Sequence, residues 1–213
     1  MALHGNSINK LIITIALTDT KMSYIAKIDK AIASASTLLN LYYGEIGAEG
    51  AKYLANILAN NSTITSLGLG NNNIGDEGVK YLAEMLCHNS TITYLYLGSN
   101  NIGTEGVKYL AEMLSHNSTI TCLDLGSNNI GVECAKYLAN SLAKNYTITR
   151  LYVYFNSVSV EATEYIEKFK ARNKNYQKYK GSFKSFINKS ALPEELYNII
   201  EGFVLLHCYN GGV

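Results

Sequence analysis

Apolar residues recur along most of the chain at a fixed spacing of about 28 residues. The clearest unit is Ile64–Thr91, and Ile92–Thr119 repeats it with five substitutions. Ser36–Thr63 and Ile120–Thr147 keep the same register, and a fifth, more divergent unit begins at Ile148. A constant period of this length indicates a solenoid, in which each unit buries its apolar face against its neighbours.

Each unit contains two hydrophobic patterns. In Ile64–Thr91 the alternation around Leu67 and Leu69 predicts a short strand with one buried face. After Gly75, apolar residues at helical spacing predict a helix that starts at Glu77, with Asp76 as its N-cap. One unit therefore reads strand, turn, helix, turn.

The spacing Ile64-x-x-Leu67-x-Leu69-x-x-Asn72-x-Ile74 matches the leucine-rich-repeat signature. Over roughly Ile8 to Asn173 the chain resembles the ribonuclease-inhibitor-like class of these repeats. The resemblance implies an α/β solenoid shaped as a horseshoe arc, with a parallel sheet on the concave side and helices on the convex side. It also aligns an asparagine ladder that can satisfy backbone groups in the turns, with Gly44 in its place in the first full unit: Asn72, Asn100, Asn128 and Asn156.

The repeats divide the chain into three parts. Residues 1–35 are a degenerate N-terminal capping repeat, with a strand over Ile8–Ile13 and a helix over Met22–Ser34. Residues 36–173 are leucine-rich repeats, and the last helix is expected from about Val160 to Asn173. Residues 174–213 form a basic neck and a C-terminal helical tail.

Charge is unevenly distributed, although the net charge is only +1. Residues 1–167 hold ten basic and fourteen acidic residues, whereas residues 168–189 hold eight basic residues, no acid and several aromatics. Such a basic stretch could bind nucleic acid or an anionic membrane. The interpretation that we favour is a capping helix whose aromatics cover the end of the solenoid, so neither nucleic acid nor membrane is expected as the main partner.

The residues that vary between units lie on the predicted concave face. Its central position reads Asn40, Gly68, Tyr96, Asp124 and Tyr152 in successive units. Tyrosine and arginine are enriched at protein-binding hot spots. The sequence therefore predicts a monomeric protein-interaction scaffold whose concave face binds a protein partner through these residues: Tyr42, Tyr43, Tyr94, Tyr96, Asp124, Arg150, Tyr152 and Tyr154.

Other reactive side chains do not form a catalytic set. Cys122 is expected on the concave face without a histidine to act as its base. His88 and His116 occupy equivalent positions in adjacent units, next to Cys87, and a solvated helix end explains them. We expect no enzyme activity, no cofactor and no metal. One tyrosine per helix forms a further column, interpreted as helix packing: Tyr53, Tyr81, Tyr109, Tyr137 and Tyr165.

The C-terminal segment Leu192-Pro193-Glu194-Glu195-Leu196 resembles the opening of an F-box. The resemblance implies that the chain is a substrate adaptor, a bacterial effector among the options, whose solenoid selects a target. Its contacts to the linker subunit of a cullin-type ubiquitin ligase would be Leu192, Pro193, Leu196, Ile199 and Ile200. The alternative is an amphipathic helix that folds back onto the last repeat.

No segment directs the chain to a membrane. The apolar run Leu11–Leu17 is too short to cross a bilayer and is interpreted as a buried strand. The recurring Asn-x-Ser/Thr triplets are interpreted as structural, and the four cysteines as reduced thiols. We expect a cytoplasmic protein, or one delivered into a host cell.

Overall fold

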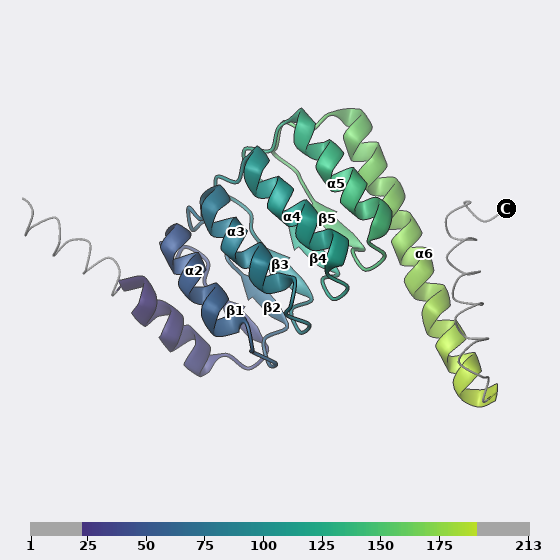
Figure 1. Ribbon diagram of the computed structural model, residues 1–213, viewed down its shortest axis with the longest axis horizontal. Helices are drawn as coiled ribbons and strands as arrows, with labels where there is room; N and C mark the ends of the chain where they lie inside the picture. Colours follow the sequence, from purple (N-terminus) through teal and green to yellow (C-terminus); the bar gives the residue numbers. More distant parts are fainter. Residues whose placement is uncertain (1–22, 191–213) are drawn as a thin grey trace, which may run out of the picture.

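The computed structural model describes residues 23–190, which form an α/β solenoid of leucine-rich-repeat type (Figure 1). Residues 23–34 are helical, whereas the expected strand Ile8–Ile13 lies outside the described residues. The elements that follow are β1 (Leu38–Asn40), α2 (Gly47–Leu58), β2 (Ser66–Gly68), α3 (Gly75–Leu86), β3 (Tyr94–Tyr96), α4 (Thr104–His116), β4 (Cys122–Asp124), α5 (Val132–Lys144), β5 (Arg150–Tyr152) and α6 (Val160–Ser190). The predicted fold class is confirmed.

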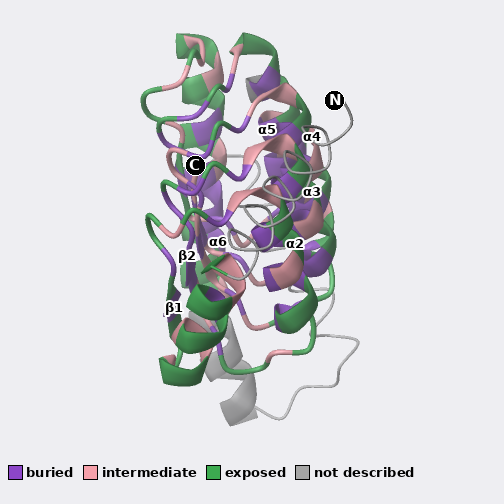
Figure 2. Ribbon diagram, turned by 90° about the vertical axis from the view of Figure 1, so that its left-hand side faces the viewer, coloured by how far each residue is buried: buried purple, intermediate pink, exposed green. Residues whose placement is uncertain are grey.

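The five strands form one parallel sheet in the order β1-β2-β3-β4-β5. The central leucine of each strand pairs with the central leucine of the next, as in Leu39 with Leu67 and Leu67 with Leu95. These leucines are buried between the sheet and the helices, which cover one face of the sheet and leave the other open (Figures 1 and 2). The apolar period of the sequence thus becomes one continuous core.

The predicted asparagine ladder holds neighbouring turns together. Asn100 accepts hydrogen bonds from the backbone N–H groups of Asn72 (3.0 Å) and Ile74 (3.3 Å) and donates to the carbonyl of Leu69 (2.8 Å). The same pattern repeats one unit earlier, where Asn72 accepts from the N–H of Gly44 at 2.7 Å. The side-chain oxygen of each asparagine therefore accepts from backbone N–H groups of the preceding unit. For this reason the turn of the first full unit, which has Gly44 at this position, receives its acceptor from Asn72.

A second asparagine ladder, which the sequence interpretation did not recognise, runs along the other end of the units. Asn117 accepts from the N–H groups of Thr119 (2.9 Å) and Ile120 (2.8 Å) and donates to the carbonyl of Leu86 (2.8 Å) in the preceding helix. The asparagines of three Asn-x-Thr triplets are buried in this ladder, which gives those triplets a structural role: Asn89, Asn117 and Asn145. Asn173, which is not part of such a triplet, occupies the same position in α6 and is also buried.

Two helix boundaries differ from the prediction. Helix α3 begins at Gly75 without a side-chain cap, and Asp76 instead accepts a hydrogen bond from the N–H of Gly103 in the next unit, at 2.6 Å. Helix α6 continues to Ser190 instead of ending near Asn173. Earlier helices end because the chain must return to the next strand, and beyond Asn173 no strand of the described sheet follows. Among residues 23–190 no helix is long and apolar enough to cross a membrane.

Candidate functional site

The open face of the sheet carries the strand residues on either side of each buried leucine, and we call it the concave face. The register places Tyr94, Cys122 and Arg150 in one row and Tyr96, Asp124 and Tyr152 in another. Adjacent strands lie about 4.8 Å apart, so the side chains within a row are in contact range. The structure therefore brings the five predicted strand residues together, and the turns after β1 and β5 add Tyr42, Tyr43 and Tyr154.

Tyrosines from both ends of the arc lean over glycines in the neighbouring units. The ring of Tyr42 covers Gly68, where a Cβ atom would lie only 2.6 Å from it. Tyr154 covers Gly126 in the same way, and its hydroxyl donates a hydrogen bond to the carboxylate of Asp124 at 3.0 Å. Burial raises the pKa of the Tyr42 hydroxyl, and the nearby Asp124 raises it further. The two glycines thus provide the space into which the tyrosines fold.

Arg150 reaches across an intervening strand to Tyr94. Its guanidinium lies 5.0 Å from the centre of the Tyr94 ring and donates a hydrogen bond to the Tyr94 hydroxyl at 3.0 Å. Cys122, in the row between them, is only 2% exposed, and burial raises the pKa of its thiol. Cys122 lies in the predicted row but is buried there between Tyr94 and Arg150, and the Arg150 charge lowers the pKa of its thiol by less than burial raises it.

Among the residues whose exposure the structure describes, the two most exposed aromatic side chains have left-handed backbone conformations. Tyr43 is 75% exposed with φ of 57°, and Phe155 is 83% exposed with φ of 53°. The equivalent residues of the central units also have positive φ but are small and polar: Asn71, Ser99 and Ser127. Bulky residues are strained in this conformation, and strain at exposed positions is a feature of binding sites.

Phe155 also completes an aromatic cluster at the C-terminal end of the concave face. Its ring packs edge-on against Tyr154 at 5.5 Å between centroids, and Tyr154 contacts Tyr152 at 6.2 Å. From the sequence, Phe155 is expected to flank the concave face beside Tyr154, but it is not among the predicted partner-binding residues. Its periodic alignment with Tyr43, against polar residues in the three units between, was the signal that could have identified it.

Two other candidate sites are the histidines at the helix ends and the F-box-like segment. His116 Nδ1 lies 3.0 Å from the carbonyl of Glu112, and within residues 23–190 no three His, Cys, Asp or Glu side chains are grouped to hold a metal ion. The F-box-like residues Leu192, Pro193, Leu196, Ile199 and Ile200 lie outside the described residues, so the adaptor role stays a prediction.

Cations of the basic segment stabilise the end of the solenoid. Lys170 pairs with Glu167 at 2.6 Å. The Arg172 guanidinium is buried and donates to the carbonyls of Leu142 and Asn145, each at 2.7 Å. These bonds satisfy carbonyls at the C-terminal end of α5, which favours the capping interpretation of this segment.

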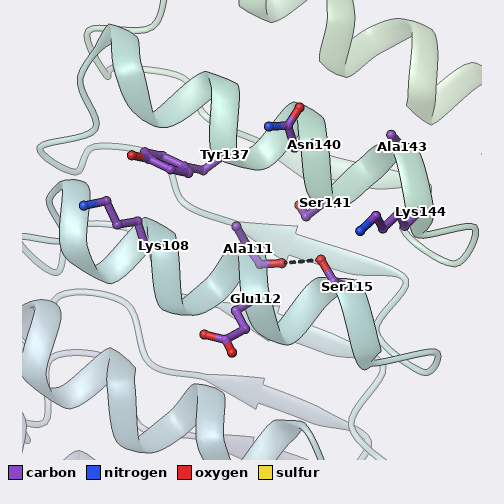
Figure 3. Close-up of a pocket in the computed structure, with 9 residues that line it drawn as sticks. All are labelled: Lys108, Ala111, Glu112, Ser115, Tyr137, Asn140, Ser141, Ala143 and Lys144. Atoms are coloured by element: carbon purple, nitrogen blue, oxygen red, sulfur yellow. Dashed lines mark hydrogen bonds between the residues drawn. The ribbon is translucent and has the colours of Figure 1, made fainter.

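The tyrosine column on the convex side packs against the core in its first three members, Tyr53, Tyr81 and Tyr109, whereas Tyr137 and Tyr165 are exposed. Lysines of one helix lie over tyrosines of the next, at 5.0 Å for Lys52 and Tyr81 and 5.4 Å for Lys108 and Tyr137. Beside Lys108 and Tyr137 a groove of about 530 Å³ opens between α4 and α5, and its lining includes Ser115 and Ser141 (Figure 3). Two preceding units carry a buried methionine at the position of Ser141, Met85 and Met113.

Comparison with known proteins agrees with this architecture. A sequence profile of the TMOD/LMOD leucine-rich domain matches residues 18–176. The solved structure of leiomodin-1 actin-binding site 2 superposes with a TM-score of 0.67 at 22% identity, covering 81% of this chain and 95% of that chain. The Caenorhabditis elegans tropomodulin C-terminal domain aligns with a TM-score of 0.44 at 14% identity, over 62% of this chain and 96% of that chain. No curated protein sequence matches.

Proposed function

The chain belongs to the TMOD/LMOD leucine-rich domain family, and we propose that it is a non-catalytic scaffold that binds a protein partner on its concave face. The observation that carries this proposal is the pair of exposed, strained aromatics at the two ends of that face, Tyr43 and Phe155. Aromatic side chains contribute large contact areas at a low cost in rotamer entropy. Between them the face is preorganised, because Tyr42, Tyr154 and Arg150 are already fixed by packing and hydrogen bonds.

The nature of the face favours a protein over a charged polymer. The only charged side chains of its strands are Asp124 and Arg150, and each is hydrogen-bonded to a tyrosine hydroxyl within the face. Such a nearly neutral aromatic surface offers hydrophobic contact and hydroxyl groups, which suit a folded protein surface. The leiomodin-1 structure is that of an actin-binding site, so actin is the first partner that we would test.

The test compares the full chain with a double variant, Tyr43→Ser and Phe155→Ser, in binding to purified actin by fluorescence anisotropy or co-sedimentation. Two of the three central units carry serine at this position, Ser99 and Ser127, so the fold should be retained. Loss of two hot-spot aromatics, each contributing more than about 1 kcal/mol, should weaken binding at least roughly tenfold. The matched control is Tyr137→Ser on the convex side, which should bind as the parent does.

Equal affinity of the double variant and the parent would contradict the concave-face assignment. If neither protein binds actin, the same three proteins are used to test other purified partners. Capture by the parent and the convex variant, but not by the concave variant, would then identify the partner of this face.

A further inference from the structure

The helix layer opens at its C-terminal end into an apolar groove that departs from the rest of the repeat. The groove has a volume of about 640 Å³ and lies between α5 and α6. Its floor and walls include Ala139, Ala143, Ala162, Tyr165 and Phe169. Lys136, the next lysine in the column that covers tyrosines elsewhere, lines this groove together with Tyr165.

Apolar side chains are exposed around this groove at a position that is polar in the two units before it. Asp76 and Thr104 are replaced by Val132 and Val160, which are 61% and 72% exposed. Tyr165 is 58% exposed, although it belongs to the column that is partly buried earlier in the solenoid. Exposed apolar residues gathered beside an apolar groove are typical of a protein-binding surface.

The charge around the groove also departs from the repeat. Glu133 and Glu161 line it, and each belongs to a column with one glutamate in the first turn of each helix from α2 to α6. In α2 to α5 a lysine follows three residues later, as in the pair Glu105 and Lys108 at 2.7 Å. In α6 that residue is Glu164, so this lysine is missing, and the groove lining itself carries Glu133 and Glu161 against Lys136.

We propose that the groove between α5 and α6 binds an amphipathic helix of a partner protein, with its apolar stripe in the groove and basic residues along its flank. The lining from Val132 to Ala143 extends about 17 Å at about 1.5 Å per residue, which is the length of roughly three helical turns. A helix of this length presents apolar residues at i, i+3, i+4 and i+7 to such a groove. The acidic rim selects lysine and arginine beside that stripe. This surface is separate from the concave face, so the two proposals succeed or fail independently.

The probe for the test is a synthetic fourteen-residue helical peptide with a leucine stripe and lysines on its flanks, titrated against the full chain by fluorescence anisotropy. Two control peptides carry the same stripe with glutamate flanks, or the same composition in scrambled order. The lysine-flanked peptide should bind at least about tenfold more tightly than either control. Equal binding of the glutamate-flanked or scrambled peptide, or no measurable binding of any, would overturn the proposal.

Two pairs of variants locate the site. The apolar variant Val132→Thr and Val160→Thr should lose about tenfold in affinity, whereas Ile57→Thr, which changes an exposed apolar residue on α2, should not. The charge variant Glu133→Gln and Glu161→Gln should lose a similar factor. Its control, Glu77→Gln and Glu84→Gln on α3, makes the same change in net charge and should bind as the parent does.

If the α3 control loses affinity equally, the peptide senses only net charge and the groove is not its site. Sedimentation velocity tests whether a second copy of the chain, instead of a partner helix, occupies the groove. A concentration-dependent dimer of the parent that the double valine variant dissolves would mean that a second copy of the chain fills the groove, and the proposed partner helix would be rejected. Circular dichroism on every variant establishes that the fold is retained.

Discussion

Removal of one buried amide from the asparagine ladder should destabilise the fold strongly. Asn100 is fully buried, and its side-chain oxygen is the acceptor for two backbone N–H groups of the preceding unit, those of Asn72 and Ile74. Asn100→Ala leaves both N–H groups inside the protein without a partner. The carbonyl oxygens that Asn100 contacts are less affected, because Leu69 O also accepts from Asn72 and Gly98 O from Asn71.

The expected loss follows from the two orphaned donors. An unsatisfied buried N–H costs about 1–3 kcal/mol, so Asn100→Ala should lower the free energy of unfolding by about 3 kcal/mol. Asn156→Ala, at the partly exposed end of the ladder, should cost less because water can replace the lost acceptor for the N–H groups of Asn128 and Ile130. Asn129→Ala is the matched control, since its side chain is exposed, and should change stability by no more than about 0.5 kcal/mol.

Urea unfolding followed by circular dichroism measures the three variants against the parent. The slope with denaturant is compared as well, because loss of a contact between repeats can uncouple the two halves of a solenoid. An Asn100→Ala protein within 0.5 kcal/mol of Asn129→Ala, with an unchanged slope, would refute the reasoning that the ladder joins the units.

Three further outcomes follow from the structure. Arg150→Ala should raise the rate at which Cys122 reacts with a thiol reagent at pH 8, measured by mass spectrometry of labelled peptides, because the gain in access outweighs the loss of the Arg150 charge, which lowers the pKa of the thiol; an unchanged or lower rate would show that Arg150 does not shield it. Ser141→Met should raise the unfolding midpoint by filling the groove between α4 and α5 with about 1 kcal/mol of apolar burial, and a lower midpoint would indicate overpacking. Leu196→Asp with Ile200→Asp tests the adaptor hypothesis, which predicts that the parent captures cullin-ligase subunits from eukaryotic lysate and that the folded double variant does not.

Some features of the face were predictable only in outline. Periodicity placed Tyr94, Cys122 and Arg150 on one surface, but it gave no indication that Arg150 spans two strands to Tyr94. It also treated Gly68 as a variable surface position, whereas the Tyr42 ring needs that space. Such contacts depend on rotamers chosen among neighbours in three different units, and a repeat pattern carries no record of that choice.

The sequence by itself determined the unit, the strand register, the buried leucines and the first asparagine ladder, because a fixed period forces equivalent residues into equivalent environments. Only the tertiary structure decided which side chains of one unit form hydrogen bonds with the next. Asp76 bonds to Gly103 of the next unit instead of capping its own helix, and Arg172 closes the end of α5 while α6 runs on. It also decided which departures from the repeat lie at a groove, since Val132 and Ser141 line grooves between neighbouring helices. The local pattern determines the strand and helix of each unit, and the contacts between units determine which surfaces remain exposed to bind a partner.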